Sequence, residues 1–206
     1  MPHFRAMRKC GMAPFLWPLF CPERGPGPFP GKLLSVDTRR LFFAFWPEPA
    51  LRAALDAARR ELFPLSGRPV DPANFHVTAA FLGAVPASRL AALRALAGPV
   101  PPATLRFDRL ELWGKQRVLV AVATQVPDAV SLAVDALWQR LDRLGFARDP
   151  RPFRPHITLV RDIRTVRAGP RFPPLDCRVA RVDLIESVAG PGGTRYEPVS
   201  VASGTP

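Results

Sequence analysis

Histidine, cysteine and tyrosine are rare in this chain of 206 residues, which contains three histidines, three cysteines and one tyrosine. The cysteines Cys10, Cys21 and Cys177 are scattered and odd in number, which argues against a disulfide framework and indicates reduced thiols in a cytoplasm. We expect Cys177, which has no histidine beside it, to be buried or inert. The chain also lacks a Walker loop, so ATP-dependent chemistry is not expected.

Long apolar runs are missing too, and no stretch of the sequence is long and apolar enough to span a membrane. We therefore expect a cytoplasmic protein that acts without a membrane partner. Residues 1–38 are rich in proline and glycine, and Pro14 and Pro18 interrupt their most apolar run. We interpret 1–38 as a disordered or mis-started N-terminal extension, with a lipid- or partner-binding arm as the alternative. Residues 39–206 are then expected to form a single domain.

Acidic residues are outnumbered, with 17 Asp and Glu against 29 Lys and Arg and a formal net charge of +12. A basic protein suits a polyanionic partner such as RNA, through contacts with its phosphates. An arginine-rich composition imposed by the genome explains the same excess, and both explanations stay open. The apolar content of 48% is sufficient for a hydrophobic core.

Residues 39–206 contain both strand-like and helix-like patterns, which indicates a mixed α/β domain. The 128–144 helix is expected to begin with Asp128 as its cap and to bury a stripe of Leu132, Ala136, Leu137, Leu141 and Leu144. The expected elements are a strand at 40–46, a helix at 47–63, a strand at 74–83, a helix at 88–96 capped by Ser88, a connector at 98–102, strands at 105–113 and 118–124, a helix at 128–144, a strand that begins near 156, and strands at 179–188 and 196–201.

One short phrase occurs twice in the chain. The first copy includes His76 and Thr78 within 74–83, and the second includes His156 and Thr158 within 153–161. Each copy reads histidine, aliphatic residue, threonine, aliphatic or small residue, and the remaining histidine, His3, lies near the N-terminus. Both copies are typical of short buried strands, in which residues i and i+2 share a face. Each histidine should therefore point the same way as its threonine.

Two imidazoles and two hydroxyls that converge on one space suit chemistry at a phosphate. One imidazole can take a proton from a nucleophile while the other protonates a leaving oxygen, since histidine titrates near neutral pH. The hydroxyls of Thr78 and Thr158 can donate hydrogen bonds to phosphate oxygens. This arrangement requires no metal and no cofactor. Spacing alone does not decide which histidine is the acid and which is the base.

Two other interpretations of the phrase remain. A histidine in a strand is commonly an ordinary core or surface residue, and a threonine there is commonly β-branched filler. The duplication argues against both. A zinc site is weaker still, because the two histidines lack a third ligand at a recognisable spacing and the chain contains no His-Glu-x-x-His or Cys-x-x-Cys.

The paired His-x-Thr phrases resemble the two-histidine (2H) phosphoesterases, and within them the bacterial and archaeal RNA 2′,3′-cyclic phosphodiesterases, once called 2′-5′ RNA ligases. The resemblance covers about residues 39 to 202. Its supporting stretches are 40–47, 75–83, 117–121, 152–161 and Glu186-Ser187 with Gly193 and Tyr196. It implies an α+β fold of two pseudo-symmetric lobes of antiparallel sheet, with helices packed outside and a central cleft that carries the two motifs.

The resemblance also implies residue roles. His76 would be the proton donor to the leaving 3′ oxygen, His156 the proton acceptor that activates water, and Thr78, Thr158 and Arg161 the substrate-binding groups. The implied activity is metal-independent hydrolysis of RNA 2′,3′-cyclic phosphate ends to 2′-phosphomonoesters by a monomer, reversible as 2′-5′ ligation. Alternatives are action on small cyclic phosphates or 2′-5′ oligonucleotides, or non-catalytic binding of RNA ends.

Residues near the motifs leave more than one interpretation open. Arg161 lies five positions after His156, so alternation places it on the opposite face unless the strand ends or bends first. A solvated strand end is the alternative to phosphate binding. We expect solvated positions for Arg154, Lys115 and Arg117, with contacts to distant RNA phosphates as the alternative. The aromatic side chains are expected to be mostly core, and the sequence does not indicate which one would stack on a base. They are Phe42, Phe45, Phe81 and Trp113.

Overall fold

The computed structural model describes residues 37–61, 67–163, 172–191 and 193–199. The prediction for 1–38 lies outside these residues except at its last two positions, where Thr38 already begins the first strand. The elements in chain order are β1 (Thr38–Phe45), α1 (Pro49–Arg60), β2 (Arg68–Pro69), the 3-10 turn η1 (Pro72–Asn74), β3 (Val77–Pro86), the 3-10 turn η2 (Ala87–Arg89), α2 (Leu90–Arg94), β4 (Gly98–Phe107), β5 (Arg109–Trp113), β6 (Val118–Val122), α3 (Asp128–Arg143), β7 (His156–Arg161), β8 (Leu175–Gly190) and β9 (Gly193–Pro198).

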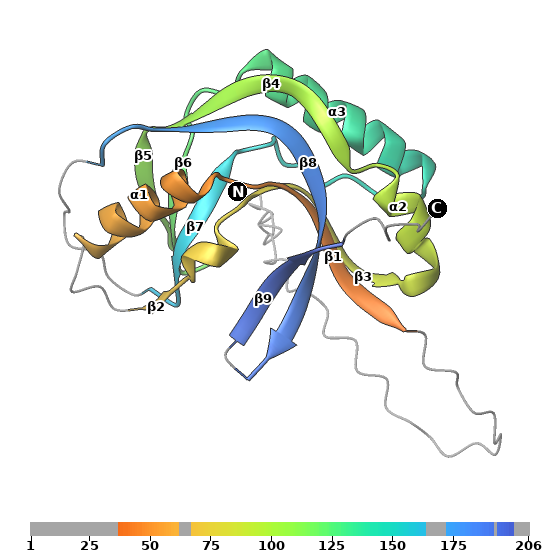
Figure 1. Cartoon of the computed structure of the whole chain (residues 1–206), viewed down its shortest axis with the longest axis horizontal. Helices are drawn as coiled ribbons and strands as arrows, with labels where there is room; N and C mark the ends of the chain where they lie inside the picture. Colours follow the sequence, from red (N-terminus) through yellow and green to blue (C-terminus); the bar gives the residue numbers. More distant parts are fainter. Residues whose placement is uncertain (1–36, 62–66, 164–171, 192, 200–206) are drawn as a thin grey trace, which may run out of the picture. The chain divides into compact units, whose positions relative to one another are not determined.

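Two antiparallel sheets form the domain, as predicted for the α+β fold (Figure 1). The first has the order β3-β1-β8-β4, with β9 paired to the far end of β8, and the second has the order β2-β7-β6-β5. Each sheet contains one motif strand: β3 lies at the edge of the first sheet, and β7 lies between β2 and β6 in the second. The duplicated phrase is thus divided between the two sheets.

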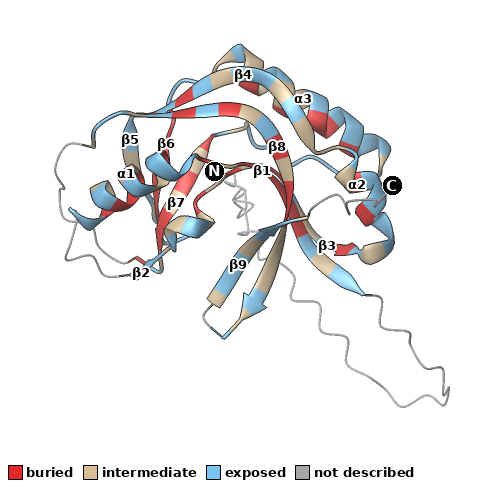
Figure 2. Ribbon diagram, in the orientation of Figure 1, coloured by how far each residue is buried: buried red, intermediate tan, exposed pale blue. Residues whose placement is uncertain are grey.

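One apolar core joins the sheets. Leu41 and Phe43 of β1 belong to the same cluster of buried side chains as Ile157 and Leu159 of β7. Buried positions follow β1, β7 and β8 in Figure 2. Helix α1 contacts β7 and β8, while α3 contacts β3 and β4, so the longer helices cover parts of both sheets. No helix among the described residues is long and apolar enough to cross a membrane.

The proline-rich stretch 98–102 was predicted as a connector, and that prediction is wrong. It is the first half of β4, which pairs with Val182 and Arg181 of β8. Proline has no backbone N–H to donate to a neighbouring strand. Because β4 is an edge strand that pairs on one side alone, its prolines are tolerated. An irregularity in the pairing between Pro99 and Ala103 accommodates them.

Details of two predicted helices also change. The side chain of Leu132 is 67% exposed, and the buried stripe of α3 consists of Val130, Val134, Leu137, Trp138 and Leu141. Asp128 is the first helical residue rather than the cap, which is Pro127. The predicted helix at 88–96 is a 3-10 turn followed by the single helical stretch α2, and Ser88 makes no capping hydrogen bond there. Hydrophobic spacing located both helices but not their ends.

Candidate active site

Both motif strands contain a β-bulge directly after the threonine. In β3, Ala44 pairs with Thr78 while the next residue of β1, Phe43, pairs with Ala80, so Ala79 is the extra residue. In β7, Val120 pairs with Thr158 while Leu119 pairs with Val160, so Leu159 is the extra residue. An extra residue reverses the alternation of faces for everything that follows it.

The bulge explains why Arg161 lies on the side of the histidine. After half-buried His156 and Thr158, Leu159 and Val160 are both buried and Arg161 is again half-buried. Strict alternation places Arg161 on the opposite face unless the strand bends first, and the bulge at Leu159 is such a bend. Arg161 also lies beside β2, where Arg68 is its partner in the antiparallel pairing of β2 with β7.

His76 stands just before β3, among aromatic rings. Its ring centroid lies 4.9 Å from that of Phe42, 4.9 Å from that of Tyr196 and 6.0 Å from that of Trp46. Tyr196 belongs to β9, and the side chain of Asn74 fixes that strand: its amide donates to the Thr194 carbonyl at 2.8 Å and its oxygen accepts from the Tyr196 backbone N–H at 3.1 Å. These contacts exclude water from much of the imidazole.

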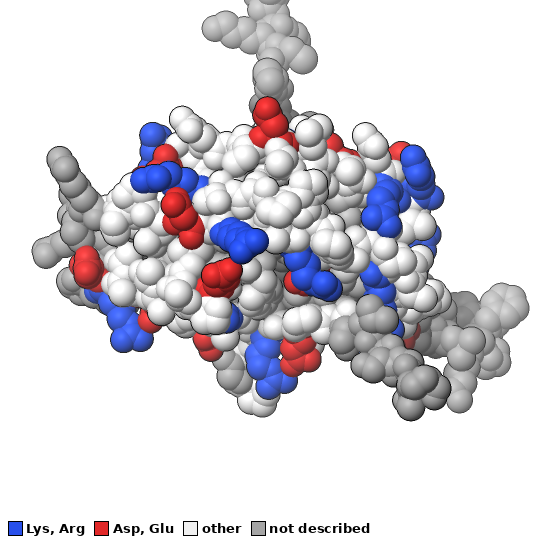
Figure 3. Space-filling model, turned by 45° about the horizontal axis from the view of Figure 1, so that its top comes forward, with Lys and Arg blue, Asp and Glu red and all other residues white. Residues whose placement is uncertain are grey.

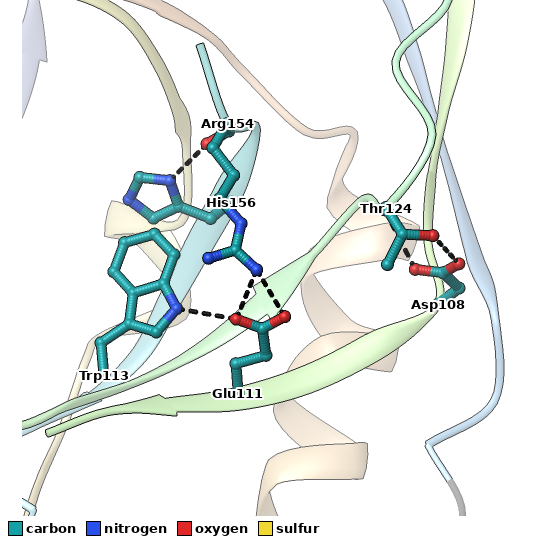
Figure 4. Close-up of polar contacts among 6 residues, drawn as sticks. All are labelled: Asp108, Glu111, Trp113, Thr124, Arg154 and His156. Carbon is teal, nitrogen blue, oxygen red and sulfur yellow. Dashed lines mark hydrogen bonds and ion pairs between the residues drawn. The ribbon is translucent and has the colours of Figure 1, made fainter. Parts of the chain in front are cut away.

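His156 is the first residue of β7 and lies against Trp113, with ring centroids 4.5 Å apart (Figure 4). The carboxylate of Glu111 accepts a hydrogen bond from the Trp113 indole at 2.9 Å and from the Arg154 guanidinium at 2.6 Å. The guanidinium also lies over the Trp113 ring, 5.3 Å from its centroid. Glu111 thus fixes both neighbours of this histidine.

The two imidazoles are oriented by the same local hydrogen bond. Nδ1 of His76 lies 2.7 Å from the carbonyl oxygen of Asn74, and Nδ1 of His156 lies 2.8 Å from the carbonyl oxygen of Arg154, in each case two residues earlier. A carbonyl oxygen can accept but not donate, so Nδ1 must carry the proton in both rings. Nε2 of each neutral histidine is therefore free to take a proton, and Nε2 of each protonated one is free to give it.

Burial and positive charge both favour the neutral imidazoles. The pKa of His76 is lowered to about 4, and desolvation is the largest cause. The hydrogen bond to the Asn74 carbonyl opposes this shift, while the charges of Arg161 and His156 contribute to it. Desolvation also lowers the pKa of His156, with contributions from Arg154 and Arg161 and an opposing one from the hydrogen bond to the Arg154 carbonyl. Arg161 acts on both rings, and His156 acts on His76, so the three groups share one electrostatic environment.

A cleft of about 1010 Å³ adjoins this environment. Its lining, among the described residues, includes His76, Thr78 and Arg161 but neither His156 nor Thr158. β1, β2, β3 and the β8–β9 hairpin contribute the remaining walls, which include Arg40, Phe81 and Tyr196. A neutral imidazole, a hydroxyl and a guanidinium facing one cleft can hold an anion and exchange a proton with it.

Comparison with known proteins identifies the family. The family model described as LigT like Phosphoesterase matches residues 45–120. The RNA 2′,3′-cyclic phosphodiesterase of Escherichia coli K12 is 36% identical in an alignment of 169 residues that covers 79% of this chain and 95% of that protein. The chain belongs to the LigT-like phosphoesterase family.

Other relatives of this LigT-like phosphoesterase agree. The RNA 2′,3′-cyclic phosphodiesterase of Archaeoglobus fulgidus is 28% identical over 79% of this chain and 98% of that protein. Among solved structures, E. coli LigT complexed with 3′-AMP is 35% identical with a TM-score of 0.69, over 80% of this chain and 97% of that chain. A Thermus thermophilus protein, TT0787, is 30% identical with a TM-score of 0.59, over 78% of this chain and 95% of that chain. The predicted resemblance and fold class are confirmed.

The surface charges of this LigT-like phosphoesterase are mixed. In Figure 3, basic and acidic side chains are interspersed over the left and middle of the visible face, and basic ones predominate at its right. Arg154 is paired with Glu111, and Arg117 donates to the Asp162 carbonyl at 3.3 Å, so both already have protein partners. Lys115 is exposed. The overall positive charge therefore does not by itself locate a nucleic-acid surface.

Several residues of the site were not found from the sequence. Nothing in the local pattern distinguishes Glu111 from other strand residues, and Asn74 and Tyr196 meet only because β9 folds back beside the turn before β3. The expectation that the named aromatics are core holds for Phe45, which is 2% exposed, and is wrong for Phe81, which is 52% exposed. Cys177 is buried as expected, and desolvation raises the pKa of its thiol to about 12.

Proposed function

We propose that this protein hydrolyses the 2′,3′-cyclic phosphate at the 3′ end of RNA to a 2′-phosphomonoester, with His76 as the proton donor and His156 as the proton acceptor. The observation that carries the proposal is the pair of His-x-Thr strands, one from each sheet, whose imidazoles are held in the same tautomer beside a shared Arg161. The relatives named RNA 2′,3′-cyclic phosphodiesterase support it.

The proposed reaction needs two proton transfers and one displacement. Water attacks phosphorus while Nε2 of His156 removes its proton, and the bond between phosphorus and O3′ breaks. Nε2 of protonated His76 gives its proton to O3′, which becomes the 3′-hydroxyl, and the phosphate remains on O2′. The net change is the addition of one water, and solvent restores the protonation states of the two histidines.

Charge builds on the non-bridging oxygens as water attacks. The hydroxyls of Thr78 and Thr158 and the guanidinium of Arg161 would stabilise that charge. No step uses a metal or another cofactor, so the activity should persist in EDTA. The reverse reaction at the same groups would join RNA ends through a 2′-5′ linkage. We also expect a cytoplasmic monomer whose partner is RNA.

The test is turnover of an RNA oligonucleotide that ends in a 2′,3′-cyclic phosphate, in EDTA, by the wild type, His76→Ala and His156→Ala. Each variant should lose roughly 10²- to 10⁴-fold in kcat, and the wild-type product should be a 2′-phosphate. His3→Ala is the matched control, because His3 is the histidine outside the two phrases, and it should retain wild-type turnover.

Other outcomes would contradict the proposal in different ways. A 3′-phosphate product would reject the assigned leaving oxygen. Tight binding of the RNA without turnover would support a protein that only binds RNA ends. Faster turnover of a cyclic mononucleotide than of the oligonucleotide would favour small cyclic phosphates as substrates.

A further inference from the structure

Asp56 and Arg59 of helix α1 form a buried ion pair. Asp56 is 8% exposed and Arg59 is 6% exposed, and Nη2 of Arg59 donates to a carboxylate oxygen of Asp56. No other charged side chain among the described residues is as fully buried. Taking two charges out of water costs free energy, and apolar side chains of similar volume are often as stabilising or more so. The stability of α1 therefore does not account for this pair.

Arg59 reaches beyond its own helix to Val70. Its Nη1 donates to the carbonyl oxygen of Val70 at 2.9 Å, and Val70 lines the cleft. The backbone N–H of Val70 in turn donates to the carbonyl oxygen of Leu159 at 2.9 Å. The Val70 backbone thus joins a buried side chain of α1 to the backbone of β7.

Leu159 is the point at which β7 departs from regular pairing. It is the extra residue of the bulge and has no counterpart on β6. On the other edge of β7, Arg68 pairs with Arg161, and a Cβ on Gly67 would lie only 2.9 Å from the carbonyl oxygen of Arg161. Because β2 consists of two residues, its pairing alone restrains β7 weakly. The contact from α1 through Val70 adds to that restraint.

We propose that Arg59 is a positioning residue, which holds Val70 against the bulge of β7 and thereby keeps Arg161 facing the cleft. The proposal rests on the function proposed above, in which the guanidinium of Arg161 stabilises the charge that builds on the phosphate. Loss of the Arg59 contact would loosen Val70 and let β7 relax toward regular pairing with β6. Regular alternation would then turn Arg161 away from the cleft.

The test is a double-mutant cycle of Arg59→Met with Arg161→Met, measured as kcat for an RNA oligonucleotide that ends in a 2′,3′-cyclic phosphate. Arg59→Met should lower kcat roughly 10- to 100-fold, since a displacement of about 1 Å at a catalytic group can cost as much. In an Arg161→Met background the same change should cause almost no further loss, because Arg59 acts through Arg161. Arg59→Lys should recover only part of the loss, because an ammonium lacks the planar fork that reaches Asp56 and Val70 together.

Arg60→Met is the matched control. Arg60 is the next residue of α1 and pairs with the same Asp56 at 2.8 Å, but its side chain is exposed. It should retain the wild-type kcat. The remaining pair between Arg60 and Asp56 also means that Arg59→Met does not leave the buried carboxylate without a cation.

A second readout needs no turnover. The charge of Arg161 contributes to lowering the pKa of both His76 and His156, so Arg161→Met should raise the pKa of each imidazole in NMR titrations of the free protein. Arg59→Met should raise the pKa of both imidazoles as well, because it displaces the same charge, whereas Arg60→Met should not. A role of Arg59 in the stability of α1 alone would leave both pKa values unchanged.

Urea titrations show which variants fold. If Arg59→Met does not, Asp56→Leu combined with Arg59→Met takes its place, since it removes both buried charges. Additive losses of kcat in the cycle, or imidazole pKa values that Arg59→Met leaves unchanged, would overturn the positioning proposal while the hydrolysis itself would stand. A wild type without turnover would instead overturn the proposed function, and the NMR titration would still test the role of Arg59.

Discussion

Binding of a phosphate should raise the pKa of His76 by several units. In the free protein, desolvation lowers this pKa to about 4, so at pH 7 only about one His76 side chain in a thousand is protonated. A proton donor in that state would be ineffective. Protonating it at pH 7 costs about 4 kcal/mol, at 1.36 kcal/mol for each pKa unit.

An anion in the cleft can supply that free energy. A unit negative charge about 4 Å from the imidazole contributes roughly 4 kcal/mol at an effective dielectric constant of 20. The two magnitudes match, so we expect the pKa of His76 to approach neutrality when phosphate is bound. The bound substrate would then raise the pKa of His76, and solvent would supply the proton that the donor needs.

The assay is an NMR titration of the imidazole carbons with pH, with and without saturating inorganic phosphate. The chain has three histidines, and His76→Asn and His156→Asn assign the two that matter. A control with equal ionic strength of chloride excludes a general salt effect. A pKa of His76 that stays near 4 in saturating phosphate would refute the reasoning, because the bound anion would then not be coupled to the proton donor.

Three further predictions concern the supports of the site. The pKa of His76 is lower in the folded protein than its usual 6.5, so the unfolded chain binds more protons between pH 6.5 and 4. The free energy of unfolding should therefore fall by up to about 3 kcal/mol as the pH drops through this window. Urea titrations should show a smaller fall for His76→Asn. Glu111→Gln should weaken the hold on Trp113 and Arg154 and reduce kcat about tenfold with KM little changed, whereas an unchanged kcat would show that Glu111 does not position His156. Asn74→Ala removes two hydrogen bonds to β9 and should lower the free energy of unfolding by about 1–2 kcal/mol. It should also lower kcat/KM, and Asn74→Asp should recover less than half of the lost kcat/KM. A melting temperature equal to that of the wild type would contradict this.

The mixed strands and helices and the duplicated His-x-Thr motif could be predicted because their signals are local, whereas the arrangement in two sheets was expected only from the family resemblance. Histidine, threonine and the apolar residues between them alternate within a few positions, and alternation is a property of a single strand. The same kind of reasoning left the face of Arg161 open and placed Phe81 among aromatic residues expected to be mostly core. A bulge depends on the register with β1 or β6, which belongs to residues distant in the sequence.

Other features were beyond the sequence for related reasons. The prolines of β4 led to the prediction of a connector, because the local sequence pattern does not indicate that a strand will lie at the edge of a sheet. Leu132 fits helical spacing, yet α3 buries Val130 and Val134 and exposes Leu132. The sequence pattern did not distinguish between these two adjacent faces of the helix. Glu111 and Asn74 act through contacts with Arg154 and Tyr196 that form only in the folded chain.

The acceptor that orients each histidine is a carbonyl two residues earlier in the same segment. In many other histidine sites the orienting acceptor is a carboxylate from a distant part of the chain. Here each stretch of about five residues contains both the histidine and the carbonyl that orients it. Each imidazole is therefore oriented within its own strand segment, independently of how the two sheets pack.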